Sequence, residues 1–246
     1  MICAPRSRLR NELKKASHDA KWQRPAAGLH RVTVSLDSLD EEVAKKMSGR
    51  RFGLAPVLAG IDAAKRAGLA PIKLNCVVQR GVNDDTLVDL AEHFRGTGVI
   101  LRFIEYMDVG TANGWKMDEV VPATEVLDRI GERFPLEPVA PSYAGEVANR
   151  YRYADGAGEI GVIASVTRPF CGGCTRARLS PEGKLVTCLF ASDGVNLLAP
   201  MRAGVDDDAL RDLMASTWIA RTDRYSEQRT EETTRDDRIE MFHIGG

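Results

Sequence analysis

The sequence predicts an α/β protein in which a parallel βα layer, or part of a (βα) barrel, is followed by a smaller C-terminal α+β region. Between residues 30 and 135, β-branched segments alternate with segments whose apolar residues recur at helical spacing. From residue 136 the pattern changes to closely spaced strand pairs joined by glycine-containing turns. We therefore divide the chain into residues 1–29, which match no element and are expected to be poorly ordered, residues 30–135 and residues 136–246.

The composition excludes several functional classes. With 43% hydrophobic and 28% charged residues and a net charge of −1, the 246-residue chain has no overall basic field, so general nucleic-acid binding is not expected. No apolar run approaches the ~18 residues of a membrane helix, and the basic start lacks the apolar centre of a secretory signal. Five cysteines without such a signal favour a reducing, cytoplasmic setting; an organelle-targeting start is the weaker alternative.

Local signals predict the elements of the first part. Strands are expected within 30–40, 71–79 and 99–108, and helices within 41–49, 54–68, 83–96 and 121–134. Asp40 and Asn83 are expected to cap the helices that follow them. Polar residues also stand where parallel folds place ligands, at or after the carboxyl ends of strands: Ser35, Asp37, Asp108 and Asn113. Solvation of loops is the alternative for each. Cys76 lies on an apolar strand face and is interpreted as a small buried hydrophobe.

The C-terminal part is expected to contain two hairpins and a capped helix. Residues 149–165 predict two antiparallel strands, and residues 176–190 predict a second hairpin that turns through "PEG". Asp206 is expected to cap a helix over 207–220. The remaining residues are polar and charged, and the chain stops at Gly245 and Gly246.

Three of the five cysteines have the spacing of a metal site. Cys171 and Cys174 form a Cys-x2-Cys pair in a "CGGC" loop, and the second hairpin returns Cys188 beside them. Three thiolates hold either zinc with a fourth ligand or an iron–sulfur cluster. Among the histidines only His243 stands on a segment able to return to the loop, so the set favours a cluster with one open iron. Three separate buried thiols are the alternative.

Two arginines stand between these cysteines. Arg176 and Arg178 alternate on an expected strand, so their side chains point to the same side. Guanidinium groups bind phosphate and carboxylate oxygens in bidentate fashion, and the pair therefore favours a small anionic ligand beside the metal. A solvated strand face is the alternative.

Several motifs, in collinear order, resemble one family. The segments "RVTVSLDSLD", "VVQRGVNDD", "RFIEYMDVG", "CGGCTRARLSPEGKLVTCLF" and the terminal "IGG" are similar to the GTP 3′,8-cyclase family of molybdenum-cofactor biosynthesis, whose members are radical S-adenosylmethionine (SAM) enzymes. The resemblance covers residues 27–246 and matches the C-terminal two-thirds of such a protein. It implies an incomplete, TIM-like radical-SAM barrel at 30–135 and a region at 136–246 that binds a [4Fe–4S] cluster and GTP and ends in a double-glycine tail.

The resemblance also implies roles for matched residues, none of them catalytic. The expected ligands of the family's second [4Fe–4S] cluster, whose open iron binds the purine of GTP, are Cys171, Cys174 and Cys188. The residues expected to contact GTP are Lys73, Arg176, Ala177 and Arg178. Those expected to contact SAM are Ser35 and Met107. The family converts GTP, with SAM, into 3′,8-cyclo-7,8-dihydro-GTP, and the cofactors supply the reactivity.

One family motif is missing. The first cluster, which binds and reduces SAM, requires Cys-x3-Cys-x2-Cys near the N-terminus, whereas only Cys3 precedes Cys76 here. SAM is expected for the family although its cluster site is absent, and the barrel begins at what would be its fourth strand. We therefore expect the chain to bind GTP but to be inactive alone, and to act as a homodimer or with a chain that supplies the N-terminal part.

Three functional hypotheses remain open. The first is a GTP 3′,8-cyclase completed by an N-terminal part, the second is a non-catalytic fragment that holds one cluster and GTP, and the third is a structural zinc-binding domain. A Cys-x3-Cys-x2-Cys motif upstream in the reading frame separates the first two, and stoichiometric zinc without inorganic sulfide identifies the third.

Overall fold

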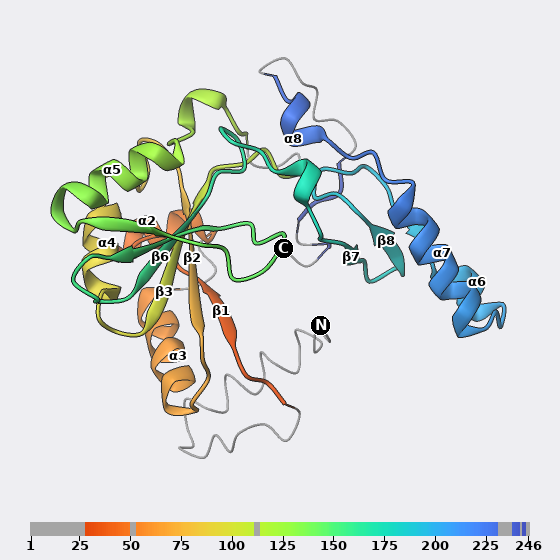
Figure 1. The fold of residues 1–246 in the computed structure, drawn as a ribbon, viewed down its shortest axis with the longest axis horizontal. Helices are drawn as coiled ribbons and strands as arrows, with labels where there is room; N and C mark the ends of the chain where they lie inside the picture. Colours follow the sequence, from red (N-terminus) through yellow and green to blue (C-terminus); the bar gives the residue numbers. More distant parts are fainter. Residues whose placement is uncertain (1–27, 50–52, 111–113, 231–237, 242, 245–246) are drawn as a thin grey trace. The chain divides into compact units, whose positions relative to one another are not determined.

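The computed structural model describes residues 28–49, 53–110, 114–230, 238–241 and 243–244. Within these residues the chain forms two compact units, each with its own sheet (Figure 1). Unit 1 contains the described residues up to Glu105 together with Val121–Pro141 and Ala148–Ile163. Unit 2 contains the described parts of Tyr106–Val120, Ser142–Val147 and Ala164–Gly246.

The sheet of unit 1 is mixed and mostly parallel. Its strands are β1 (Val32–Ser35), β2 (Ile72–Val78), β3 (Val99–Glu105), β4 (Leu136–Val139), β5 (Asn149–Tyr153) and β6 (Glu159–Ile163). They follow the order β1-β2-β3-β6-β5-β4, in which the first four are parallel and β5 runs antiparallel to both neighbours. The α/β class is therefore confirmed. Strands β4 to β6, which the sequence analysis placed with the C-terminal part, extend this sheet.

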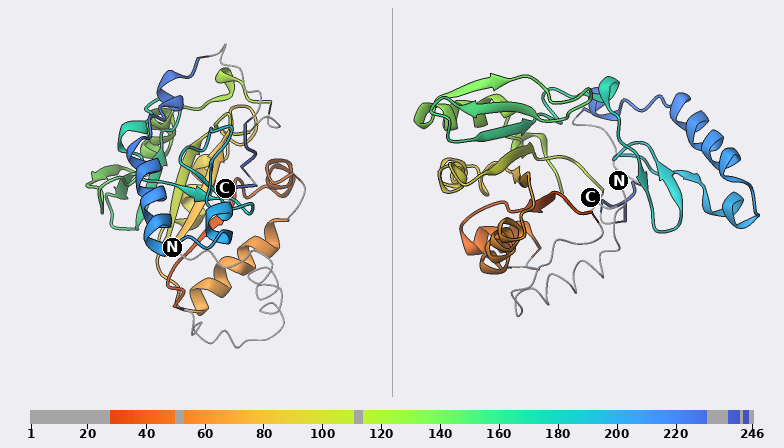
Figure 2. Two further views of the ribbon diagram at one scale, coloured as in Figure 1. Left: turned by 90° about the vertical axis from the view of Figure 1, so that its right-hand side faces the viewer. Right: turned by 60° about the horizontal axis from the view of Figure 1, so that its bottom comes forward.

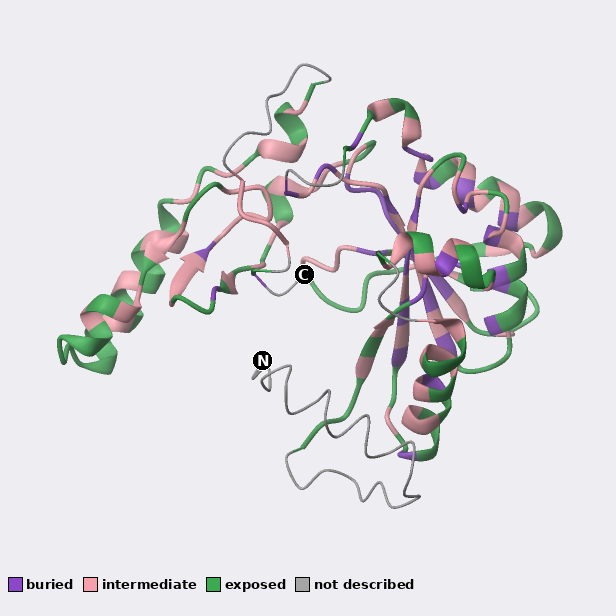
Figure 3. Cartoon of the chain, turned by 180° about the vertical axis from the view of Figure 1, so that it is seen from behind, coloured by how far each residue is buried: buried purple, intermediate pink, exposed green. Residues whose placement is uncertain are grey.

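In β2 and β3, buried and half-buried residues alternate strictly, and the buried ones form the core of unit 1. Every second residue of both strands is buried, as expected for a sheet covered on one face. Register partners form two buried rows across β2, β3 and β6: Leu74, Leu101 and Ile160, then Cys76, Phe103 and Val162. These rows lie in the buried centre of the sheet (Figure 3). Cys76 is 0% exposed, which confirms it as a buried hydrophobe, and burial raises the pKa of its thiol well above the usual range.

Four helices accompany this sheet. They are α2 (Glu41–Met47), α3 (Leu54–Arg66), α4 (Leu87–Phe94) and α5 (Ala123–Arg133). Contacts join α3 to β1 and β2, and α4 and α5 to β3. The predicted cap of α2 is confirmed, because the Asp40 carboxylate accepts from the N–H groups of Glu42 and Val43 at 2.9 Å each. The apolar stripe of α4 is also confirmed as buried.

The predicted cap of α4 is wrong. The helix begins at Leu87 with Thr86 in the cap position, and Asn83 lies before it, 0% exposed. The Asn83 amide oxygen accepts from the Gln79 N–H at 2.9 Å. Its amide nitrogen donates to the carbonyls of Asp37 and Val77, at 2.8 Å each. The Asn83 amide thus pairs with three backbone groups near the end of β2, which uses both its donors and its acceptor. As a helix cap it would leave these backbone groups without this partner.

Unit 2 is built on a small antiparallel sheet of β7 (Arg178–Leu179), β8 (Lys184–Val186) and β9 (Val195–Asn196). Its helices are α6 (Leu198–Arg202), α7 (Asp207–Ile219) and α8 (Tyr225–Gln228), with single 3-10 turns η1 (Met117–Glu119) and η2 (Cys171–Gly173). Helix α7 runs alongside the sheet (Figures 1 and 2). Both antiparallel hairpins predicted from the sequence are confirmed, and so is Asp206 as the cap of α7. None of the helices in the described ranges is long and apolar enough to cross a membrane.

Candidate functional site: the cysteine and arginine cluster of unit 2

The Cys-x2-Cys loop is a single 3-10 turn. The Cys174 N–H donates to the Cys171 carbonyl at 3.2 Å, and the Gly173 N–H donates to the Phe170 carbonyl at the same distance. A Cβ atom on Gly172 or Gly173 would meet no other atom within 4 Å. Both cysteines are partly exposed. The loop therefore presents two accessible thiols beside open space.

The third cysteine follows the end of β8. Cys188 is partly buried, and burial raises the pKa of its thiol, assisted by the charges of Asp223, Cys171 and Cys174. The thiols of Cys171 and Cys174 therefore lie near enough to Cys188 to act on it electrostatically, and metal binding by the three together stays a prediction. Over the described residues, no three histidine, cysteine or acidic side chains stand in the geometry that holds a metal ion. The donor set nevertheless fits one, because three thiolates are the ligands that zinc and iron–sulfur clusters take.

Arg176 acts directly on one thiol. Its Nε donates to the Cys174 sulfur at 3.4 Å, and its guanidinium lies over the Phe170 ring at 5.2 Å from the centroid. Burial raises the pKa of Cys174, but the hydrogen bonds and charge of Arg176, together with the charge of Arg221, outweigh it, so the net pKa lies below the usual value. The thiolate form of Cys174, which is the form that binds metal, is thereby favoured.

Arg178, like Arg176, is half-buried. Burial lowers the pKa of its guanidinium, the positive charge of Arg176 lowers it further, and Cys174 and Cys188 act in the opposite direction. The prediction that both arginines stand on one strand is wrong, because β7 contains only Arg178 and Leu179, and Arg176 precedes it. Ala177, between the two, is exposed. Two cations and three thiols therefore share one region of unit 2, which suits an anion bound beside a metal.

Asp108 joins the C-terminal segment to the loop after β3. Its side chain is 1% exposed and forms ion pairs with Arg229 at 3.1 Å and Arg238 at 3.0 Å. The Tyr225 hydroxyl donates to the same carboxylate at 2.5 Å. The side chains of Arg229 and Arg238 are only 2% and 4% exposed. Asp108, predicted as a ligand-facing residue, is instead the centre of a buried charge network, and the neighbouring Met107 is half-buried.

Aromatic rings surround these buried cations. The Arg229 guanidinium carbon lies 5.7, 5.2 and 5.6 Å from the ring centroids of Trp115, Phe190 and Tyr225. Arg238 lies over Tyr225 at 4.3 Å. Ring faces offset part of the cost of burying a second cation against one carboxylate. Sequence spacing carried no signal for this network, since its members lie far apart along the chain.

In unit 1, a polar row crosses the sheet. Ser35, Asn75 and Arg102 are register partners on β1, β2 and β3, and the Arg102 Nε donates to the Asn75 amide oxygen at 2.9 Å. Lys73 stands two residues before Asn75 on the same, half-exposed face. The next partner is Gly161, where an added Cβ would approach the Arg102 Cγ to 3.4 Å. The sequence analysis named Ser35 and Lys73; it missed Arg102, which only the register reveals.

Two further predicted residues are not on this row. The Asp37 carboxylate accepts from the Val77 N–H at 2.8 Å, and burial raises its pKa, although that hydrogen bond acts in the lowering direction. Asp37 therefore ties the loop after β1 to β2. Asn113 lies outside the described residues.

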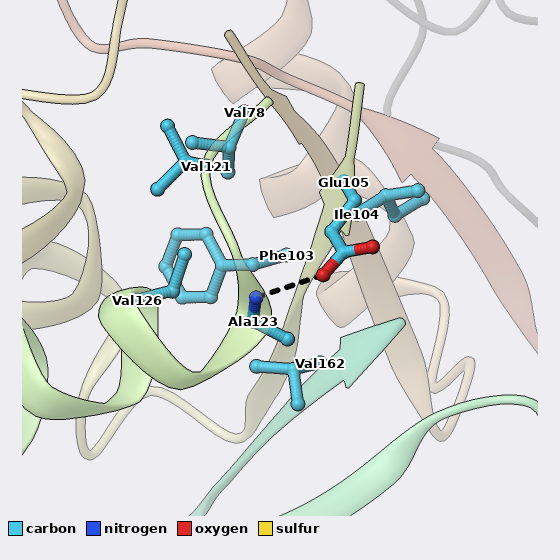
Figure 4. A pocket seen from close by; sticks show the side chains of 8 residues that line it. All are labelled: Val78, Phe103, Ile104, Glu105, Val121, Ala123, Val126 and Val162. Carbon is cyan, nitrogen blue, oxygen red and sulfur yellow. Dashed lines mark hydrogen bonds between the residues drawn. The ribbon is translucent and has the colours of Figure 1, made fainter. Parts of the chain in front are cut away.

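A small pocket in unit 1 is structural. Its lining is apolar apart from Glu105, which is 3% exposed, and the Glu105 carboxylate accepts from the Ala123 N–H at 2.9 Å at the start of α5 (Figure 4). An acidic group at a helix start satisfies free N–H groups and suits the helix dipole. The other lining residues are Val78, Phe103, Ile104, Val121, Val126 and Val162. The hydrogen bond from Ala123 to Glu105 therefore anchors the start of α5 to the end of β3.

Two family models match the chain. The model described as Molybdenum Cofactor Synthesis C matches residues 99–227, and that of the Radical SAM superfamily matches residues 25–94. A solved radical SAM methyltransferase from Sphaerobacter thermophilus aligns with 50% of this chain and 33% of its own at 15% identity, with a TM-score of 0.35, which is too low to carry an argument.

Curated relatives agree with both models. Proteins named GTP 3′,8-cyclase match from Xanthomonas axonopodis pv. citri (51% identity over 89% of this chain), Acidothermus cellulolyticus (52% over 85%) and Staphylococcus haemolyticus (43% over 89%). The chain covers 65%, 60% and 66% of these relatives, less than two thirds of their length. Because the first model matches more than half of its residues, this chain belongs to the Molybdenum Cofactor Synthesis C family.

Proposed function

We propose that this chain is the cluster- and GTP-binding part of a GTP 3′,8-cyclase of molybdenum-cofactor biosynthesis. The carrying observation is that the Arg176 Nε donates to the Cys174 sulfur at 3.4 Å, while Arg178 pairs with Val186 on β8, two residues before Cys188. In this proposal the three thiolates hold the second [4Fe–4S] cluster of the family. When bound, that cluster offers an open iron to the purine of GTP.

The chain's own residues bind and orient the nucleotide. Arg176 and Arg178 receive anionic oxygens of GTP, with Ala177 between them. Lys73 is included as a GTP contact on the family resemblance alone. Ser35 and Met107 contact SAM. In this proposal residues 30–135 form a partial (βα) barrel, and residues 136–246 form the binding region that follows it.

The proposal leaves SAM cleavage to residues not found in this chain. Its five cysteines include no Cys-x3-Cys-x2-Cys triplet, so no matched residues chelate SAM through a cluster iron. Activity then requires a further part that carries such a triplet, for example on another chain. Ligation by free thiolates also suits a reducing, cytoplasmic setting. A structural zinc site is the second candidate, favoured by the same three thiolates.

Anaerobic reconstitution with iron and sulfide tests the metal. We expect about four irons per chain, visible charge-transfer absorption, and loss of both in Cys174→Ala. The matched control is Cys76→Ala, which removes a thiol buried in unit 1. Stoichiometric zinc with no inorganic sulfide would establish the zinc site instead.

Calorimetry on the reconstituted chain tests the nucleotide. Arg178→Ala should weaken GTP binding by about 1.5–3 kcal/mol, the range for hydrogen bonds to charged groups. Arg152→Ala is the control, because this exposed arginine pairs with Glu137 at the sheet edge of unit 1. Equal affinity in both variants would leave the arginines with no role in binding.

A further inference from the structure

The segment 221–229 of unit 2, "RTDRYSEQR", contacts other parts of the unit through every second residue. The sequence alone shows this segment only as polar and charged. In the structure, its alternate side chains reach both cysteine-bearing segments and the Asp108 network. The five residues are Arg221, Asp223, Tyr225, Glu227 and Arg229.

Three of them fasten the backbone around the cysteines. The Arg221 guanidinium donates to the Cys174 carbonyl at 2.7 Å. The Thr187 hydroxyl, adjacent to Cys188, donates to the Asp223 carboxylate at 2.6 Å. The Gly172 N–H donates to the Glu227 carboxylate at 3.3 Å. One short segment thus holds the Cys-x2-Cys loop at both its N–H side and its carbonyl side, and holds the end of β8 as well.

The other two residues give this segment a fixed anchor. Tyr225 and Arg229 both bind the buried Asp108 carboxylate. Arg224 completes the local structure by pairing with Glu227 at 2.5 Å, which orients the carboxylate that accepts from the loop. The cysteine-bearing segments are therefore connected to a buried ionic centre through one stretch of nine residues.

We propose that residues 221–229 form a brace that positions the three cysteines, with Arg221, Asp223 and Glu227 as its positioning residues. The inference rests on the proposed function only where it concerns a bound cluster. The brace sets geometry by fixing the loop backbone, and it sets the local field by placing two carboxylates and one guanidinium beside the thiols.

The field of the brace has a predictable sign. Asp223 and Glu227 place negative charges beside the cysteine-bearing segments through Thr187 and Gly172, whereas Arg221 places a positive charge at the Cys174 carbonyl. Reduction of a cluster adds an electron, so removing a nearby negative charge makes reduction easier and removing a positive charge makes it harder. A purely structural element would not produce shifts of opposite sign from neighbouring residues.

The first experiment uses the full metal-free chain. Deuterium exchange is measured on peptides covering 169–176 and 185–190. We expect faster exchange of the first peptide in Glu227→Ala and of the second in Asp223→Ala, and near-native exchange in Glu227→Gln, which keeps an acceptor oxygen. Arg211→Ala is the control, since this exposed arginine of α7 pairs with Asp208, outside the segment 221–229. Unchanged exchange in Glu227→Ala and Asp223→Ala would overturn the brace.

The second experiment uses the chain loaded anaerobically with iron and sulfide. Iron release to a chelator should be roughly 10- to 100-fold faster in Glu227→Ala, the range for residues that orient metal ligands. The reduction potential should rise in Glu227→Gln and Asp223→Asn and fall in Arg221→Gln. Shifts of the same sign, or none, would refute the electrostatic role. If the wild-type chain takes up no iron, the proposed function fails, and deuterium exchange alone decides the brace.

Discussion

Replacing Asp108 by asparagine should destabilise unit 2 strongly. The carboxylate is 1% exposed and is the shared partner of Arg229 and Arg238, whose side chains are almost equally buried. Asparagine keeps an oxygen that accepts hydrogen bonds but removes the negative charge that two buried cations share. Breaking a buried pair by removing one partner costs ~3–5 kcal/mol, and the surrounding rings offset only part of this.

Urea denaturation followed by tryptophan fluorescence measures the effect. Trp115 reports on the network directly, because it is 2% exposed, donates to the Tyr106 carbonyl at 2.7 Å and faces Arg229. With a urea dependence of about 1–3 kcal/mol per molar, the midpoint should fall by about 1–5 M. The control is Asp208→Asn, an exposed partner of Arg211 on α7.

A second substitution sharpens this test. Adding Arg229→Met to Asp108→Asn removes one stranded cation, and it should recover part of the lost stability if uncompensated charge is the cause. The reasoning is refuted if Asp108→Asn shifts the midpoint no more than the control does. It is also refuted if the double variant loses as much stability as the two single variants, Asp108→Asn and Arg229→Met, lose in sum.

Three further outcomes are expected. Burial raises the pKa of Asp37 above 3.8, so its ionisation costs stability as pH rises through the raised pKa. Asp37→Asn should therefore stabilise the chain at pH 7 in thermal unfolding, and the gain should vanish below pH 3.8; the control is Asp62→Asn, at an exposed side chain. Asn83→Ala strands buried backbone groups of Gln79 and Val77 and should lower the free energy of unfolding by about 1–3 kcal/mol per stranded group, measured in urea; no loss would refute the buried-amide account. The reconstituted, reduced chain should release no 5′-deoxyadenosine from SAM above background, by chromatography; steady release abolished by Cys171→Ala would contradict this.

Local patterns predicted the elements well, because each is encoded within a few residues. The alternation around Leu74 and Leu101 identified β2 and β3, and the acceptors Asp40 and Asp206 marked two helix starts. The assignment of residues 136–163 differed because strand pairing is non-local. The sequence of β6 (Glu159–Ile163) does not indicate that its neighbour is β3. Its run of buried residues is nevertheless typical of a central parallel strand.

The site was predictable to the extent that its chemistry is local. The cysteine spacing and Arg178 lie within twenty residues, so the hairpin alone suggests that they meet. The Asp108 network joins positions 117 and 130 residues apart, at Tyr225 and Arg238, and no periodicity connects them. Asn83 was assigned to a cap because the sequence offers no sign of the two backbone carbonyls that compete for its amide.

The order in which the chain visits its two units limits how the protein can be divided. Tyr106–Val120 and Ser142–Val147 belong to unit 2, yet both are flanked by stretches of unit 1. A gene fragment cut at any single position therefore removes part of one sheet or one network along with the unit it was meant to omit. Exchanging one unit between homologous genes would need several crossovers at once. We therefore expect recombination to pass on both units together.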